Sequence, residues 1–493
     1  MRPSSSLVSW STPVLLALLA GCAVTSPQPP VPPTAAATPG GLPAPAPVVQ
    51  AAAPSATAGA AATRPAVAAA SPPPAAAAAP PAPGGLPPFA TVIKDAKQID
   101  GPITAWQKDD KLWLELSPEQ FGKPFMLSPK LSTGIGEAFV LGGLMAYSVS
   151  GAGGPQLVEF VRVHNVVRLQ ARNTEVIAKP GTPEARAVAV SYSPSLLGSV
   201  AVVSQPHPQR KTVLVDASTL FLSDMLGVGM QLQRAFRQGY SLDPRNSSIT
   251  AVRGSPQSLE IQTQNHYYAG SIAVPTPGTP PGMPVPTVPR YVPDSRSLFV
   301  GHHYSLAPLP EQPMAPRRAD ARIGLTTTSV LDYGDDVARS PRVRMIERWR
   351  LEKKDPQADM SEPVKPITFW LDRNVPLKYR AVITEAILEW NKAFERIGFK
   401  DAIVVKQQSD DAEFDTLDLG YASVRWLMSA VPGFGAIGPK HVDPRSGEIL
   451  DADVAFETLS SRSLRSLRTQ TLYGAASFAA VLGGHAEHAG HEH

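Results

Sequence analysis

The sequence lacks the features that mark several common classes of protein. Its 493 residues include a single cysteine, Cys22, which excludes a disulfide framework and a zinc site built from cysteines. Charged residues make up only 18%, the net charge is +3 and no block of five basic residues occurs, so nothing indicates a nucleic-acid-binding surface. The motifs GxSxG, HExxH and HxxEH are all missing, so neither a serine-hydrolase nucleophile turn nor a zinc-binding helix can be assigned.

The N-terminal residues 1–22 have the order of an export signal. Arg2 precedes an apolar run from Pro13 to Ala20, which ends in small residues, and this run is too short to span a bilayer that needs roughly 20 apolar residues. Its last four residues, LAGC, resemble the signal box of bacterial lipoproteins. That resemblance implies that Cys22 carries the lipid and becomes the mature N-terminus; the alternative is a plain secretory signal. Ala23 follows, which favours anchoring at the outer membrane of the bacterial cell envelope.

Residues 23–88 read as a disordered linker rather than a domain. Alanine and proline dominate, the segment has no aromatic residue and Arg64 is its single charge, so no core could offset the entropy of ordering it. Proline-rich chain extends by about 3.1 Å per residue, which gives a reach of up to roughly 200 Å. We expect this linker to hold a folded body away from a membrane.

Two β-rich domains are expected next, at 89–185 and 186–355. In the segment KLWLELS, Leu112, Leu114 and Leu116 alternate with other residues and so share one face of a strand. Residues 137–150 and 157–173 read as two strands joined by a glycine-rich turn, and residues 275–293 as a proline-rich loop.

Three histidines of these domains are expected to be non-ligands. His164 falls in the second of the two strands just named, where a single histidine is usually structural. His302 and His303 are adjacent, so on a strand they would point to opposite faces and make a poor pair of metal ligands.

Residues 356–493 show a more regular pattern. A short apolar strand at 366–372 precedes a helix whose apolar residues recur at steps of three and four, with Pro376 at its first turn and Gly398 at its end. Two strands, an edge segment, a last strand near 449–456 and the beginning of a helix follow. The apolar stripe comprises Ile383, Ala386, Ile387, Trp390, Phe394 and Ile397.

From about Phe89 onward the chain resembles a family of large bacterial zinc-dependent metalloproteases, in which two domains of unknown function precede a metzincin-like catalytic domain. The resemblance rests on long collinear stretches, among them HHYSLAPLP, RWRLEKKDPQADMSEPVKPITFWLDRNVP, EWNKAFERIGFKDAIVV and VDPRSGEILDADV. It implies peptide-bond hydrolysis by a zinc-activated water, a protein or peptide substrate, an edge strand that helps to bind it, and a zinc helix after ILDADV.

The sequence departs from the family pattern at the decisive point, because HExxHxxGxxH does not occur. We therefore expect an α+β protein: mostly antiparallel β-rich domains, then the N-terminal part of a metzincin-like α/β protease domain that lacks the zinc helix. On this expectation the chain is an inactive N-terminal fragment of a family member, truncated before the motif. The alternative is a non-enzymatic surface lipoprotein that binds a partner, or a transition metal through its histidine-rich tail. That tail contributes the weak candidate ligands His485, His488, His491 and His493.

Overall fold

The computed structural model describes residues 85–145, 156–431, 433–466 and 468–469. The export signal, Cys22, nearly all of the linker and the four tail histidines lie outside these ranges. The described part is mainly β-structure in predominantly antiparallel sheets, which confirms the expectation of β-rich domains. Among its helices, none is long and apolar enough to cross a membrane.

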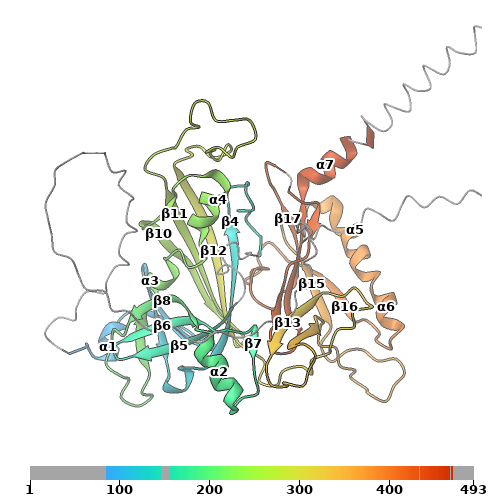
Figure 1. Cartoon of the computed structure of the whole chain (residues 1–493), viewed down its shortest axis with the longest axis horizontal. Helices are drawn as coiled ribbons and strands as arrows, with labels where there is room; N and C mark the ends of the chain where they lie inside the picture. Colours follow the sequence, from blue (N-terminus) through green and yellow to red (C-terminus); the bar gives the residue numbers. More distant parts are fainter. Residues whose placement is uncertain (1–84, 146–155, 432, 467, 470–493) are drawn as a thin grey trace, which may run out of the picture. The chain divides into compact units, whose positions relative to one another are not determined.

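A seven-stranded antiparallel sheet dominates the first part of the body (Figure 1). Its strand order is β10-β11-β12-β4-β5-β6-β8. The sheet joins strands from both sides of residue 185, where a domain boundary was expected. The bounds are β4 Pro124–Thr133, β5 Gln156–Val163, β6 Val166–Ala171, β8 Ser195–Ala201, β10 Ser241–Gly254, β11 Leu259–Tyr268 and β12 Ser297–Pro308.

A four-stranded sheet packs with it around one apolar core. The order is β1-β2-β3-β9, with β1 Lys97–Ile99, β2 Thr104–Lys108, β3 Lys111–Leu116 and β9 Val213–Asp216. Leu112, Leu114 and Leu116 are fully buried in this core, as their alternation predicted. The helices of this region are short: α1 Phe89–Val92, η1 Pro118–Gln120, α2 Pro183–Ser191, α3 Ser218–Phe221 and α4 Val228–Phe236.

Two local predictions are wrong. Residues 137–145 form no long strand but a tight turn, in which Glu137 and Val140 pair. His164 lies in the turn between β5 and β6 at a φ of 56°, not within a strand. In both places an apolar run resembled a strand, although local turns interrupt the pairing.

A small sheet leads into the C-terminal region. Its order is β14-β13-β7, with β7 Val176–Ile177, β13 Thr327–Asp332 and β14 Arg342–Ile346. The next sheet is mixed, in the order β16-β15-β17-β20-β18, and β19 also pairs with β20. The bounds are β15 Ile367–Leu371, β16 Ile403–Gln407, β17 Ser423–Leu427, β18 Ala436–Ile437, β19 Lys440–Asp443 and β20 Glu448–Glu457.

The expected long helix of the C-terminal region is divided into α5 Leu377–Leu388 and α6 Asn391–Glu395. Pro376 occupies the N-cap position of α5, one residue before the first turn in which it was expected, and Gly398, at a φ of 85°, follows α6 as expected. Neither helix has a buried residue, and Trp390 is 65% exposed. The apolar stripe is therefore only partly covered. The helix α7 Thr458–Ser466 follows β20, where the sequence predicted a helix to begin.

Candidate functional site

The mixed sheet offers an open strand edge at β18. Within the described ranges, β18 pairs only with β20, with Ala436 opposite Phe456 and Ile437 opposite Ala455. This pairing is antiparallel, whereas β16, β15, β17 and β20 pair with one another in parallel. An edge strand presents backbone N–H and C=O groups that another extended chain can pair with.

The sheet has two different faces, because side chains alternate along β20. Phe456 contacts Trp426 on one face, with ring centroids 6.4 Å apart, and Tyr379 of α5 stacks on Trp426 at 4.9 Å. The opposite face carries Asp451 and Asp453, which are both buried. Helix α5 therefore covers an aromatic face, and the charged face points toward the seven-stranded sheet.

A buried lysine of β4 meets these two aspartates. Lys130 Nζ lies 2.6 Å from Asp451 Oδ2 and 3.1 Å from Asp453 Oδ2, and all three side chains are at most 1% exposed. Burial by itself would lower the pKa of Lys130, but the two carboxylates raise it above its ordinary value. Burial raises the pKa of Asp451 to about 7; Lys130 opposes this rise, and Asp453 adds to it. One cation thus faces two acids in a region that excludes water.

Neighbouring side chains extend this polar contact. Ser128, two residues before Lys130 on the same face of β4, has its Oγ 2.7 Å from Nδ1 of the buried His441. Burial, with a further contribution from Lys130, holds the pKa of His441 well below its usual range. Ser423 donates to Asp453 Oδ1 over 2.5 Å.

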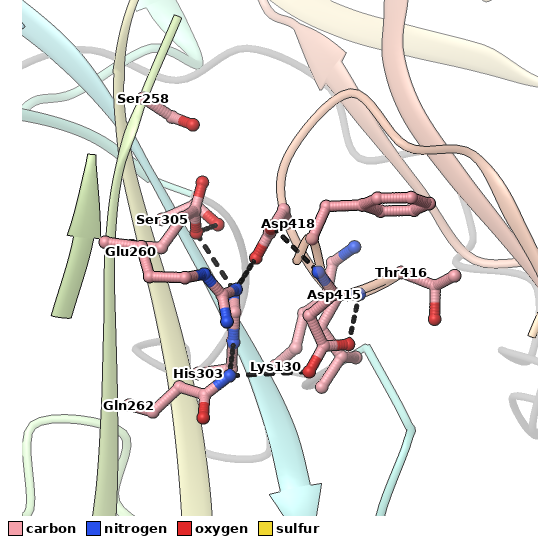
Figure 2. Close-up of polar contacts among 12 residues, drawn as sticks. Lys130, Ser258, Glu260, Gln262, His303, Ser305, Asp415, Thr416 and Asp418 are labelled. Atoms are coloured by element: carbon pink, nitrogen blue, oxygen red, sulfur yellow. Dashed lines mark hydrogen bonds and ion pairs between the residues drawn. The ribbon is translucent and has the colours of Figure 1, made fainter. Parts of the chain in front are cut away.

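His303 forms a second buried cluster between β11, β12 and the loop at 415–418 (Figure 2). Its Nε2 lies 2.9 Å from Glu260 Oε2 and 3.1 Å from Asp418 Oδ1. Asp418 also pairs with Arg253 at 2.5 Å. Burial favours neutral histidine, but hydrogen bonds to Asp418 and Glu260 raise the pKa of His303.

These three residues are the one group in the described ranges that offers three potential metal-ligand atoms within 4.8 Å of one another. Tetrahedral zinc with bonds of about 2.0–2.2 Å separates its ligand atoms by about 3.4 Å. The observed separations of 2.9 and 3.1 Å are instead those of hydrogen bonds. Arg253 already balances the charge of Asp418. The group therefore fits an ionic hydrogen-bonded cluster better than the zinc implied by the family resemblance.

The adjacent histidines do point to opposite faces of β12. His302 lies on the side of Tyr304, with ring centroids 5.7 Å apart, and burial lowers its pKa to about 4. His303 lies with Ser305, which donates to Glu260 Oε2 over 2.5 Å. Sequence reasoning dismissed both histidines as ligands but missed the buried polar role of His303.

The sequence analysis did not identify the residues that form the buried clusters, although four of them leave a signal. Asp451 and Asp453 are two residues apart in ILDADV, in an otherwise apolar strand, and Ser128 and Lys130 have the same spacing. Polar pairs at strand spacing mark one face. Their partner, however, lies more than 300 positions away in the sequence.

Comparison with protein families identifies two segments of the chain. Residues 86–134 match the family model described as domain of unknown function DUF5118, and residues 151–354 match domain of unknown function DUF5117. The chain contains two domains of unknown function. The expectation of two such domains ahead of residue 356 is therefore confirmed. Searches of curated proteins and of solved structures found no match.

Both buried clusters join the matched segments to the region after residue 356. Lys130 belongs to the DUF5118 match and pairs with Asp451 and Asp453. His303 belongs to the DUF5117 match and pairs with Asp418. The DUF5118 segment thus contacts the charged face of the mixed sheet, and the DUF5117 segment contacts the loop at 415–418. Among the described residues, no strand pairs with the outer edge of β18.

Proposed function

We propose that this protein is a lipid-anchored, peptide-binding member of the zinc-dependent metalloprotease family that it resembles. In this proposal residues 356–457 supply a substrate-binding sheet, and the domains at 86–134 and 151–354 brace it. Cys22 anchors the chain in the bacterial cell envelope, at the outer membrane. The 493 residues contain no HExxH, so we propose that the chain itself binds extended peptide without hydrolysing it.

The observation that carries this proposal is the position of β18. The order of elements after residue 366 is strand, helix, strand, strand, edge strand, strand and helix, with the short β19 between the last two strands. This is the order that the sequence pattern predicted. The strand β18, like β19, pairs antiparallel with β20, at the edge of a sheet whose other four strands are parallel. Extended peptides bind such edges through backbone hydrogen bonds.

A zinc-supplemented assay with casein tests this proposal. The full chain should bind unfolded casein but leave it intact, with or without a chelator, because no glutamate base is placed between two zinc-ligand histidines. Absence of binding would contradict the peptide-binding role. Chelator-sensitive cleavage would contradict the claim of inactivity and would require a zinc centre elsewhere, with the four tail histidines as the first ligands to substitute.

A further inference from the structure

An aromatic side chain stands exposed beside β18 on a strained turn. In the turn Glu137–Val140, the two central residues, Ala138 and Phe139, have φ values of 54° and 59°. Hairpin turns of this kind strongly prefer asparagine and glycine at these positions. A bulky residue with positive φ is rare, and such strain tends to occur at functional sites. Even so, 51% of Phe139 is exposed.

Contacts from several directions fix this turn. Val140 donates to the Glu137 carbonyl over 2.9 Å, and Gln231 of α4 donates to the Ala138 carbonyl over 3.2 Å. The buried Glu137 carboxylate accepts backbone N–H groups from Arg290 and Tyr291 at 2.7 and 3.2 Å. The turn therefore holds Phe139 in place before any ligand arrives.

Phe139 forms one wall of an apolar hollow next to β18. Its ring stacks on Phe434, with centroids 6.0 Å apart and planes inclined by 25°. A Cβ atom on Gly433 would lie 3.1 Å from the Phe139 ring, so glycine allows the loop to approach it closely. The hollow has a volume of about 210 Å³, and Leu141 and Val431 also line it. Cavities of about 150 Å³ hold a benzene molecule.

The polar side chains in this lining are the acceptor Glu137 and the already engaged Ser429. Glu137 Oε1 accepts the two N–H groups just described, and the one hydroxyl hydrogen of Ser429 is shared between Glu457 Oε1 and the Val431 carbonyl, each 3.0 Å away. A negatively charged ligand side chain would therefore lose its hydration beside the Glu137 carboxylate without gaining a partner. An uncharged aromatic or branched side chain would cover the open part of Phe139 and the exposed Val431.

We infer that this hollow, formed by the Phe139 turn and the loop before β18, is a subsite that selects extended peptides with a large apolar side chain. The inference rests on the proposed binding of peptide at β18. It assigns part of the specificity to the segment between the two matched domains, because Phe139 lies between residues 134 and 151.

The test measures binding, not cleavage, with the full chain and three fluorescein-labelled heptapeptides. The peptides share a threonine-rich sequence and differ only in a central phenylalanine, alanine or aspartate. We expect the phenylalanine peptide to bind at least tenfold more tightly than the aspartate peptide, by fluorescence anisotropy. Phe139→Ala should reduce this preference to within threefold, as truncating an interface anchor does, and Phe139→Leu should restore most of it.

Phe299→Ala is the matched control, since Phe299 is also half exposed, at 47%, and also contacts an aromatic ring, that of His266. It should leave the preference unchanged. Val431→Asp, at a position that is 63% exposed, should abolish the preference without disturbing the fold. Peptide binding that is equal for all three peptides, or unchanged in Phe139→Ala, overturns the subsite and leaves the proposed function standing. No binding of any peptide to the folded wild type overturns both.

Discussion

The mixed sheet meets the rest of the protein through two different faces. Its charged face is fully buried against β4, where Lys130, Asp451 and Asp453 are at most 1% exposed. Its aromatic face lies under α5 and α6, which have no buried residue. Removing one partner of a buried ion pair is strongly destabilising, whereas replacing a half-exposed apolar side chain usually changes stability little. We conclude that the charged face fixes how the mixed sheet sits on the seven-stranded sheet that contains β4.

Replacing the buried lysine should have the largest effect. Lys130→Met leaves two carboxylates in a buried site without a cation, which should lower the free energy of unfolding by about 3–5 kcal/mol. Urea denaturation followed by circular dichroism measures this. Lys108→Met is the control, because its pair with Asp95 is 3.6 Å long and exposed, and it should change stability by less than about 1 kcal/mol. If the two substitutions lowered the free energy of unfolding equally, the charged face would contribute no more to stability than an exposed ion pair.

A substitution in the apolar core should cause the next largest loss of stability. Leu114→Ala removes a fully buried side chain from the core and should cost about 2–5 kcal/mol. On the aromatic face, Leu388→Ala in α5 alters a side chain that is 38% exposed, and we expect a loss below about 1 kcal/mol. A large loss in Leu388→Ala would mean that the helices are buried more tightly than the structure shows.

The charged face should also make stability depend on pH. The folded-state pKa of Asp451, raised to about 7, exceeds its unfolded value, so folding binds a proton between roughly pH 4 and 7. The contribution of Asp451 to the free energy of unfolding is therefore present at low pH and is lost as the pH rises toward 7. The stability of wild type relative to Asp451→Asn should fall between pH 5 and 8 in thermal melts.

Asp294→Asn provides the contrast for this measurement. Arg296 lowers the pKa of Asp294 to about 2, so its titration lies well below pH 5. The stability difference caused by Asp294→Asn should stay constant from pH 5 to 8. A constant difference for Asp451→Asn as well would contradict the raised pKa.

The smallest effect is expected when a residue of the second buried cluster is replaced and zinc binding is measured. Glu260, His303 and Asp418 lie at hydrogen-bond rather than metal-ligand separations. Isothermal titration with Zn²⁺ should therefore give the same result for wild type and Glu260→Gln. A chain that ends at Leu482 isolates any contribution of the four tail histidines. Loss of a zinc-binding step in Glu260→Gln alone would make this cluster a metal site.

The sequence predicted those parts of the fold that depend on local pattern. The alternation of Leu112, Leu114 and Leu116 identified a core strand, and residues 449–456 were recognised as the last strand. The turn at Ala138 and Phe139 was missed, because contacts from α4 and from Arg290 and Tyr291 stabilise a backbone that the residues themselves disfavour.

The buried clusters could not be predicted, because their members are brought together only by the docking of distant strands. Ser128 and His441 are 313 positions apart in the sequence, and Lys130 and Asp451 are 321 apart. No local pattern encodes such a pairing. The sequence did predict the edge segment that became β18, since the order of strands and helices around it is a local property of the chain.

Hydrogen exchange of the full chain, with and without the phenylalanine heptapeptide, tests the central claim most directly. Backbone amides of the segment 433–438 should exchange more slowly when the peptide is bound, because an added strand pairs with the open edge of β18. The amides of β16, at the other edge of the same sheet, should be unaffected. Protection at β16 instead, or at neither edge, would contradict peptide binding at β18.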